Sequence, residues 1–480
     1  MSDKSENKRR LRLWQAFAAV LALLVLAFCA FTLFRAVSFK NTQIARELTS
    51  LENESLENLL IGQYPEKYKY LKPLPYNIGK PQLDVWAKSA ILIDVSNGNV
   101  LYEKNADLII PPASMTKLFA MYVVEEEVAA GRLSYDQVIP LPPESWACNM
   151  PPHSSLMFLG KGQRVTLEEL LLGLSICSGN DAAYALAYTV CGSMEEFVER
   201  MNRAARELGL KNTHFVESSG YSELNQTTAR EMADFAATYL RRFPSSLHRF
   251  HSVLDFTYPK ERNLAPGDRL AAQDFTQGLP QKITMPITQQ NTNPLLGKLE
   301  GCDGLKTGYI DESGYNLTLT AVRGETRFLS VTMGGPGNNV REGQAGRVHD
   351  GTELMEWAFK NFADYSLELK VHSYYVRSFN SSEKMLCLRP AYQEGTFTAP
   401  YISGNTMAEN LASIKVEVQL PDYCWGGIEQ GSTLGKIVIS SGDYLLEEIP
   451  LVADRTLKKG NFITKISDNL IILKYRIKIK

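Results

Sequence analysis

Apolar positions change their spacing several times along the chain, and each change predicts a different element. The run from Leu13 to Phe34 has no charged residue and is dominated by Leu, Ala, Val and Phe, so it is long enough to cross a bilayer as one helix. Lysine and arginine residues cluster just before it, which predicts a cytoplasmic N-terminus with the rest of the chain outside. We therefore expect a cytoplasmic segment at 1–12, an uncleaved transmembrane anchor at 13–34 and a spacer at 35–83. A cleaved signal peptide is the alternative interpretation.

Short β-branched runs and helical periodicity alternate between residues 84 and 364. The Asn97-Gly98 pair separates two such runs, 89–95 and 100–104, which predicts a hairpin with a two-residue turn. Apolar spacing predicts further elements, with helices at 113–130, 166–176, 197–208, 228–241 and 351–362 and strands at 317–323 and 326–333. Residues 260–285 are charged, carry Gly and Pro and lack periodicity, so we expect an exposed excursion there. The mixture predicts an α+β domain over 84–364, with an antiparallel sheet and flanking helices.

The last part of the chain, from about Tyr365, has the pattern of an all-β domain. Runs at 414–420, 436–440 and 444–452 predict short strands separated by Gly, Pro and Asp turns, as in a small sandwich. Lysine and arginine alternate with apolar residues from Ile471 to Lys480, which predicts a strand with one solvated face. We therefore expect a β-rich C-terminal domain at 365–480 and no C-terminal amphipathic helix.

Composition excludes several function classes. The chain has 480 residues, 44% of them hydrophobic, 22% charged, and a formal net charge of -2, which suits a folded protein of two or three domains. No basic patch with interleaved aromatics occurs, so we expect no nucleic-acid partner. The seven cysteines form no tight Cys-x-x-Cys pattern, and we expect no metal and no cofactor. We expect the six cysteines after the anchor to be small buried apolar residues, with Cys387 and Cys424 as the one plausible disulfide.

The first candidate for chemistry is Ser114-Met115-Thr116-Lys117, placed directly after a Pro-Pro break and at the start of a predicted helix. Residues three apart on a helix share a face, so the amine of Lys117 can reach the hydroxyl of Ser114. Burial and a neighbouring cation, for which Lys306 is the candidate, would lower the pKa of that amine and make it a base. Taken alone, the same pattern is more often a helix cap followed by a solvated lysine.

Two more motifs follow in order. Ser178-Gly179-Asn180 falls in a predicted turn between two helices, where the hydroxyl can relay a proton and the amide can bind a lysine or a substrate carbonyl. Lys306-Thr307-Gly308, followed by Tyr309, occurs once in the chain; glycine lets a substrate backbone approach, and lysine with threonine can bind a carboxylate. Each motif by itself is also compatible with an ordinary turn or strand junction. Their order and setting favour acyl transfer through a serine ester.

Together these motifs resemble the low-molecular-mass penicillin-binding proteins, the serine-type D-Ala-D-Ala carboxypeptidases of peptidase family S11. The resemblance covers roughly Leu83 to Asp364. It is carried by five segments of the sequence, at 112–117, 178–183, 208–215, 303–308 and 314–316. It implies the penicillin-binding protein/β-lactamase-like transpeptidase fold followed by a small β-sandwich domain. Three differences from the family pattern are expected. They are the long 260–285 segment, Ser219, which stands where a histidine is often found, and the lack of a C-terminal amphipathic helix for membrane attachment, which the N-terminal anchor would replace.

The resemblance also implies a role for each candidate residue. Ser114 would be the acylated nucleophile, Lys117 its base and Ser178 the proton relay. The backbone N–H groups of Ser114 and Tyr309 would form the oxyanion hole. The substrate-binding set implied in this way is Asn180, Lys306, Thr307, Gly308, Tyr309 and Arg341. Of these, Arg341 would help to hold the terminal carboxylate of the substrate.

The function implied by the resemblance is removal of the last D-alanine from peptidoglycan stem peptides, on the outer side of a bacterial cytoplasmic membrane. β-Lactams would acylate the same serine. Three alternatives remain open: a D,D-endopeptidase, a β-lactamase and a non-catalytic cell-wall-binding protein. A β-lactamase typically has a Glu-x-x-Leu-Asn segment, whose spacing Glu223-Leu224-Asn225 lacks. A non-catalytic protein should have lost a polar motif residue, and all of them are present.

Overall fold

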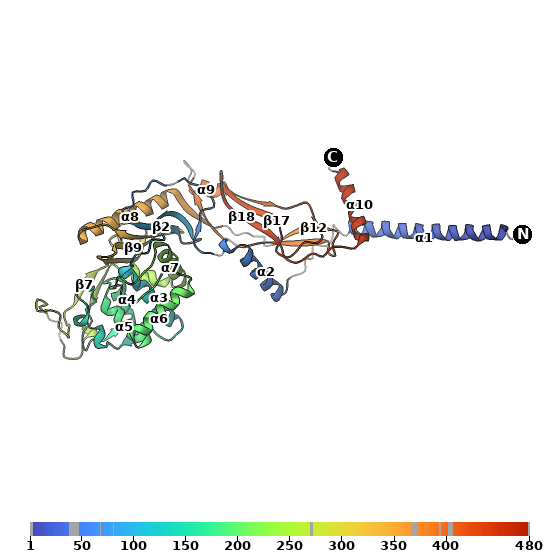
Figure 1. The fold of residues 1–480 in the computed structure, drawn as a ribbon. Helices are drawn as coiled ribbons and strands as arrows, with labels where there is room; N and C mark the ends of the chain where they lie inside the picture. The colour runs from blue at the N-terminus through green and yellow to red at the C-terminus, as the bar shows by residue number, and fades with distance from the viewer. Residues whose placement is uncertain are drawn as a thin grey trace. The chain divides into compact units, whose positions relative to one another are not determined.

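The computed structural model describes residues 3–37, 48–67, 69–79, 81–268, 272–366, 373–392, 395–401 and 407–478. The chain divides into two compact units. One holds residues 70–366 together with 396–408, and the other holds 1–69, 367–395 and 409–480 (Figure 1). The three motifs all lie in the first of these units, the catalytic unit.

A six-stranded sheet forms the centre of the catalytic unit. Every neighbouring pair is antiparallel except the short parallel pair of β1 and β3 at one edge. In spatial order the strands are β1 (Lys72–Pro73), β3 (Asn99–Lys104), β2 (Ser89–Asp94), β10 (Thr326–Gly335), β9 (Gly314–Arg323) and β8 (Cys302–Ile310). The predicted 89–104 hairpin is β2 and β3. The third motif lies within the edge strand β8, so its backbone borders the site.

Helices cover both faces of this sheet (Figure 1). Successive side chains of a strand point to opposite faces, and both sets are apolar here. Ile91 and Ile93 of β2 pack in one core with the helices α3 to α7, while Leu92 packs in a second core with α8. The helices are α3 (Thr116–Ala129), α4 (Leu167–Ser175), α5 (Asn180–Cys191), α6 (Met194–Glu207), α7 (Ala229–Arg242) and α8 (Val340–Asn361). The predicted α+β architecture is therefore confirmed.

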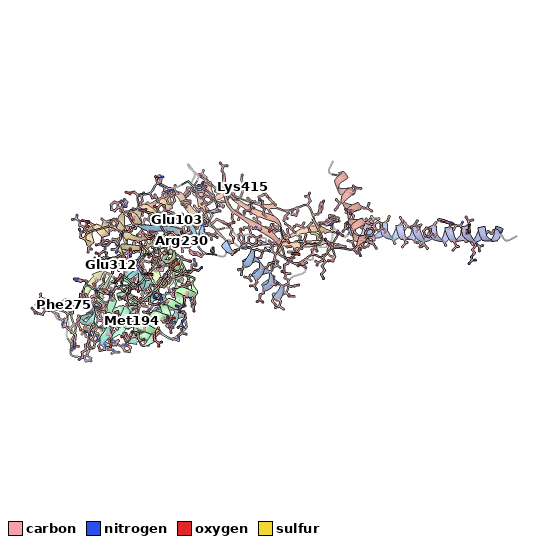
Figure 2. The ribbon with its side chains drawn as sticks, in the orientation of Figure 1. Glu103, Met194, Arg230, Phe275, Glu312 and Lys415 are labelled. Atoms are coloured by element: carbon pink, nitrogen blue, oxygen red, sulfur yellow. The ribbon has the colours of Figure 1, made fainter. Side chains whose placement is uncertain are left out.

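Three small strand pairs complete the catalytic unit. They are β4 (Val138–Ile139) with β5 (Val165–Thr166), β6 (Asp255–Tyr258) with β7 (Ile287–Gln290), and β11 (Phe362–Ser366) with β14 (Thr396–Pro400). The predicted excursion lies between β6 and β7. Its Phe275, labelled in Figure 2, stacks on Phe158 with ring centroids 6.3 Å apart. The described part of the excursion therefore packs on the loop that precedes the second motif.

The second unit contains another six-stranded sheet. Its order is β15 (Ile414–Gln419), β17 (Thr433–Ser441), β18 (Tyr444–Ala453), β13 (Met385–Pro390), β12 (Tyr374–Phe379) and β16 (Cys424–Trp425). Its helices are α1 (Asp3–Val37), α2 (Ser50–Gln63), α9 (Met407–Ser413) and α10 (Phe462–Lys478). The predicted spacer thus contains a capped helix, α2, whose Thr49 and Glu52 form a capping box.

Two predictions for the C-terminal part are wrong. Residues 471–478 belong to helix α10, not to a strand. The buried face of this helix carries Thr464, Ser467, Asp468 and Ile471, while Phe462, Ile463, Ile466, Leu470 and Leu473 are exposed. The exposed apolar side chains recur every three or four residues, as on an amphipathic helix. Basic and apolar residues alternate from residue 471 onward, and this short alternating run favoured a strand over the helical spacing of the whole segment.

Cys387 and Cys424 are both free and buried in the structure, which agrees with the expectation of small buried residues and not with the alternative of a disulfide. Cys387 belongs to β13 and Cys424 to β16, and β12 lies between those two strands. Two strands separated by a third are about 10 Å apart, since neighbouring strands are about 4.8 Å apart. A disulfide needs Cα atoms within about 7 Å. Each thiol instead fills a small buried position.

Candidate active site

The nucleophile motif lies where the chain enters helix α3. Ala113 has a φ of +49°, and the short 3-10 turn Ala113–Met115 leads directly into α3. A non-glycine residue with positive φ is strained, and such strain is tolerated where surrounding packing fixes the backbone. Lys117 follows Ser114 by one helical turn, and its Nζ lies 2.8 Å from the Oγ of Ser114. The predicted contact between amine and hydroxyl is present.

The second motif joins the first through the same amine. Ser178 has a φ of +57° in the turn between α4 and α5. Asn180 accepts a hydrogen bond from Lys117 Nζ at 2.8 Å and donates one to Ser154 Oγ at 3.1 Å. The carboxylate of Asp181 accepts from two backbone N–H groups of the 157–159 loop. This carboxylate fixes the loop beside the motif.

The third motif closes the site from strand β8. Lys306 Nζ donates to Ser178 Oγ at 3.0 Å, and Thr307 Oγ1 donates to Thr292 Oγ1 at 2.8 Å. A Cβ on Gly308 would lie 2.4 Å from Pro112 O and 3.2 Å from Ser114 N. The strand backbone therefore passes directly beside the nucleophile, at a distance that only glycine permits.

Both lysines are fully buried, with exposed fractions of 0% for Lys117 and 1% for Lys306. Burial lowers the pKa of Lys117 to about 7, against the opposing effect of the Glu217 and Asp181 carboxylates. The pKa of Lys306 is also driven well below its ordinary value, first by burial and then by repulsion from Lys117 and Arg347. Desolvation thus provides the neutral base. The two amines repel each other when both are charged, which disfavours a second positive charge in the site.

Two further partners of the site escaped the sequence motifs. The backbone carbonyl of Ser219 accepts a hydrogen bond from Lys117 Nζ at 2.5 Å. Arg347 of α8 is buried and donates to Gly308 O at 2.5 Å and to Asn316 O at 3.0 Å. Arg347 therefore ties α8 to the strand that carries the third motif. Any residue type can supply a backbone carbonyl, so the sequence does not indicate the role of Ser219. Arg347 is a charged residue near Arg341, but no motif in the sequence assigns it to the site.

Tyr309 and Arg341 lie outside the hydrogen-bonded cluster. The Tyr309 side chain is 43% exposed and stacks on Tyr315, with ring centroids 4.3 Å apart. Its backbone follows Gly308 in β8, beside Ser114. Arg341 lies in the first turn of α8 with an exposed side chain. The structure thus joins Ser114, Lys117 and Asn180 in one set of hydrogen bonds and Ser178 and Lys306 in a second. The two sets meet in the turn that carries both Ser178 and Asn180, and Tyr309 follows Gly308 beside them.

The arrangement suits acyl transfer. It offers a hydroxyl with a buried amine at hydrogen-bond distance, a second hydroxyl held by a second amine, and a strand edge along which an extended peptide could bind. Within the described residues, no group of three or more His, Cys, Asp or Glu side chains could hold a metal ion.

Comparisons with known proteins agree with this geometry. Residues 77–337 match a family model described as D-alanyl-D-alanine carboxypeptidase. The chain is 31% identical over 380 residues to D-alanyl-D-alanine carboxypeptidase DacF of Bacillus subtilis, which covers 79% of this chain and 87% of the relative. It is 30% identical over 402 residues to DacA of Escherichia coli, which covers 82% of this chain and 89% of the relative. A D-alanyl-D-alanine endopeptidase of Pseudomonas aeruginosa is 29% identical over 285 residues, or 59% of this chain and 81% of the relative.

Solved structures give the same result for the fold. Penicillin-binding protein 5 from Haemophilus influenzae superposes with a TM-score of 0.62 at 27% identity, covering 80% of this chain and 100% of the other. Penicillin-binding protein 6B from Escherichia coli has a TM-score of 0.60 at 27% identity, with the same coverage. The predicted penicillin-binding protein fold, followed by a β-rich domain, is confirmed.

Proposed function

Because the chain belongs to the D-alanyl-D-alanine carboxypeptidase family of serine peptidases, we propose that it removes the terminal D-alanine from peptidoglycan stem peptides while anchored in the cytoplasmic membrane. The carboxypeptidase activity is that of the family. One observation carries the mechanism: the buried amine of Lys117 lies 2.8 Å from Ser114 Oγ and donates to Asn180. A neutral amine in that position is a base at neutral pH.

The first half of the reaction forms an acyl-serine. Neutral Lys117 takes the proton of Ser114 as Oγ attacks the carbonyl carbon of the penultimate D-alanine. The developing oxyanion points toward the backbone N–H groups of Ser114 and Tyr309. The C–N bond then breaks, and the proton that Lys117 took from Ser114 passes through the Ser178 hydroxyl, which accepts from Lys306, to the leaving amine of the last D-alanine. Lys117 is then neutral again.

The second half restores the serine. A water molecule gives its proton to the neutral Lys117 and attacks the ester carbonyl. The ester C–O bond then breaks and Ser114 recovers its proton, which releases the shortened peptide as a carboxylic acid. A β-lactam carries a cyclic amide in place of the scissile bond, so opening of its ring would leave the same ester on Ser114. The leaving nitrogen stays tethered in that adduct, which slows hydrolysis.

Arg341 is the proposed partner of the substrate's terminal carboxylate. Arg347, six residues later on the same helix, donates to Gly308 O of strand β8. At 1.5 Å per residue, the Cα of Arg341 is about 9 Å further along the helix axis. We infer that the long, exposed side chain of Arg341 reaches the carboxylate end of a peptide bound along β8. Guanidinium binds carboxylate in a bidentate manner.

The membrane part of the proposal rests on α1. Within Lys8–Phe34 an 18-residue stretch has a mean hydropathy of 2.7 and contains no buried residue, as expected for a helix that contacts lipid. Within the same unit, Ser467 of α10 donates to Thr32 near the end of this helix at 3.2 Å. The exposed apolar side chains of α10 would then lie near the bilayer surface, where an amphipathic helix binds.

The test uses the full chain in detergent with a pentapeptide that ends in D-Ala-D-Ala. We expect release of D-alanine, and a penicillin adduct whose mass maps to Ser114. The variant Ser114→Ala should give neither. A wild-type chain that forms no adduct and releases no D-alanine would contradict the mechanism and favour a non-catalytic wall-binding role. Fast loss of the adduct would instead identify a β-lactamase.

Endopeptidase activity is a second candidate, favoured by the similarity to the Pseudomonas aeruginosa endopeptidase. Both reactions use the same acyl-serine and differ in the leaving group beyond the scissile bond. An endopeptidase must accept a branched leaving group, whereas a carboxypeptidase can bind a free terminal carboxylate. Parallel assays on the pentapeptide and on a cross-linked dimer of stem peptides separate them. Cleavage of the dimer at a higher kcat/KM would replace the first assignment.

A further inference from the structure

The Glu217 carboxylate organises a tight turn beside the active site. Its two oxygens accept hydrogen bonds from the backbone N–H groups of Ser219 and Gly220, both at 2.6 Å, and from the Ser219 hydroxyl at 2.6 Å. Asn225 donates to the same carboxylate at 3.0 Å. The backbone N–H of Ser222 also donates to it, at 3.4 Å. Five donors therefore converge on one side chain, which is more than an ordinary turn requires.

This turn delivers an acceptor to the catalytic amine. The backbone carbonyl of Ser219 in this turn accepts a hydrogen bond from Lys117 Nζ. The Glu217 carboxylate accepts from the N–H groups of Ser219 and Gly220. The Gly220 N–H belongs to the same peptide unit as the Ser219 carbonyl, so Glu217 fixes the orientation of that carbonyl.

The other partners at hydrogen-bond distance from Lys117 Nζ are Asn180 Oδ1 and Ser114 Oγ. A neutral amine has two N–H donors and one lone pair, so Ser219 O and Asn180 Oδ1 accept from it while the Ser114 hydroxyl donates to it. The turn therefore supplies one of the two acceptors that aim the amine.

The turn also presses against the backbone just ahead of the nucleophile. Gly220 has a φ of +78°, and a Cβ there would lie 1.8 Å from Ala113 O and 2.8 Å from Ser114 N. Asn225 is fully buried and donates both to Glu217 and to Thr116 Oγ1 of α3, the latter at 3.2 Å. A shift of the turn would therefore displace the base and the nucleophile together.

Three charged groups face Lys117 from the elements packed around it. Glu217 comes from the turn, Asp181 from α5 and Lys306 from β8. The Glu217 carboxylate opposes the effect of burial and raises the pKa of Lys117, and Asp181 acts in the same direction. Asp181 is itself fully buried, and burial raises its pKa to about 6. Glu217 is therefore the carboxylate best placed to control the charge of the base at neutral pH.

We propose that Glu217 is a positioning residue for acyl transfer: it holds the 217–220 turn so that Ser219 can orient the Lys117 amine, and its negative charge sets the pH at which that amine becomes a base. The inference rests on the proposed function. Glu217 makes no contact with the reacting atoms in this arrangement, and acts through Ser219 and Lys117.

The test measures the rate of penicillin acylation of the full chain from pH 5 to pH 9. In the wild type the rate should fall below about pH 7, as Lys117 takes up a proton. Glu217→Gln removes the charge, so the acid limb should move to lower pH by about 0.5 to 1 unit. It also replaces one acceptor oxygen by a donor, and the limiting rate at high pH should fall about tenfold, as for a lost charge-assisted hydrogen bond.

A second variant separates charge from position. Glu217→Asp keeps the charge but is one methylene short of the turn, so its acid limb should stay near the wild-type pH while its limiting rate falls. Glu223→Gln removes an exposed carboxylate from the same loop and should match the wild type in both. Adduct formation counts only folded protein, so each rate is measured on the folded fraction. If Glu217→Gln folds poorly, the limiting rate of Glu217→Asp tests the positioning role.

The outcomes are distinct. Wild-type limiting rates in both Glu217 variants would overturn the positioning role, and an unmoved acid limb in the Gln variant would overturn the electrostatic role. An inactive wild type would refute the proposed function itself. A variant with lower thermal stability but an unchanged pH profile and limiting rate would leave Glu217 a structural residue only, which also contradicts the proposal.

Discussion

At the scale of single residues, the site depends on how closely two backbones approach. Gly308 of β8 lies where a Cβ would be 2.4 Å from Pro112 O and 3.2 Å from Ser114 N. We expect Gly308→Ala to push the strand away from the nucleophile and to lower the penicillin acylation rate by two or more orders of magnitude, since a shift of about 1 Å can cost about 100-fold. Active-site titration with a fluorescent penicillin measures it.

Gly62→Ala is the matched control for this substitution. Gly62 lies in helix α2, and nothing stands within 4 Å of its Cβ position. In a helix, alanine is favoured over glycine by about 0.5–1 kcal/mol, so this variant should acylate at the wild-type rate and be no less stable. A Gly308→Ala variant that also acylated at the wild-type rate would show that the strand can move without consequence.

The residues of the cluster differ in how far sequence could predict them. The contact of Ser114 with Lys117 follows from helical spacing alone, because both lie in one turn. The contact of Lys306 with Ser178 joins residues 128 positions apart, and was expected only from the family resemblance. Ser219 acts through its backbone carbonyl, so its side chain carries no signal. Glu217 acts through a turn whose shape the local sequence does not specify.

At the scale of elements, Arg347 couples helix α8 to the two strands β8 and β9. It is buried, donates to the carbonyls of Gly308 and Asn316, and its guanidinium lies 5.0 Å from the centre of the Tyr315 ring. Arg347→Met would remove two buried charge-assisted hydrogen bonds to backbone carbonyls, each worth about 1.5–3 kcal/mol. We expect a lower thermal midpoint and slower acylation, measured by calorimetry and adduct formation.

The control for that variant is Arg203→Met on the exposed face of α6, which should change neither quantity. Arg347→Lys adds a sharper comparison, because lysine keeps the charge but loses the planar fork that binds two acceptors. We expect it to recover part of the stability and little of the acylation rate. Full recovery of both by lysine would show that only the charge matters at this position.

A second feature at the scale of elements is a pair of neighbouring carboxyl groups, Asp364 of strand β11 and Asp94 of strand β2. Burial and the neighbouring Asp94 carboxylate raise the pKa of Asp364 from 3.8 to about 9. Its Oδ2 accepts from Ser96 at 2.5 Å, whereas the buried Oδ1 has no partner among the described residues. A proton on Oδ1 would resolve this, since it could be donated to Asp94. The folded protein therefore binds a proton that the unfolded chain releases.

The sign of the pH effect follows from that raised pKa. The stabilisation is complete below about pH 4, where both states are protonated, and is lost as the pH rises toward 9. Unfolding free energy should therefore decrease with pH, by at most about 1.4 kcal/mol per unit. Asp364→Asn, whose amide donates to Asp94 at every pH, should flatten the profile of the thermal midpoint between pH 5 and 8.

Asp136→Asn, on the exposed side of the catalytic unit, serves as the comparison and should keep the wild-type slope. If Asp364→Asn kept that slope too, Asp364 would be ionised in the folded protein and its carboxylate paired by another donor. Measuring both variants over the same pH range excludes a general effect of lost surface charge.

Element predictions from sequence succeeded where one face of an element is buried and failed where the period was read from too short a run. The helices of the catalytic unit have apolar stripes against the sheet, and their predicted positions agree with the structure to within a few residues, apart from the start of α8. In α10 the buried face is polar, with Asp468 accepting from the backbone N–H of Asn380. The apolar face of α10 is exposed, so the rule that apolar side chains are buried and polar ones exposed does not identify this helix from its sequence.

At the scale of the whole molecule, the open question of topology is whether α1 stays attached. The uncharged apolar run from Leu13 to Phe34 lies within the continuous helix α1, and it exceeds the usual length of a signal-peptide core. Alanine precedes the pair Phe28-Cys29, and the bulky aromatic makes a poor cleavage site. Sequence alone cannot decide between anchor and signal, because both begin with basic residues followed by an apolar helix.

The intact mass of the protein extracted from membranes distinguishes the two. An uncleaved anchor predicts the mass of the full chain, and resistance to extraction by alkaline carbonate, because a spanning helix buries about 20 apolar residues in lipid. A chain that lacks residues 1–34 should be released by carbonate, since the apolar face of α10 can bind only at the interface. It should keep its rate of penicillin acylation, because the catalytic cluster lies wholly within the other unit. A mature protein that begins after Phe34 would instead identify α1 as a signal sequence and leave α10 as the remaining membrane contact.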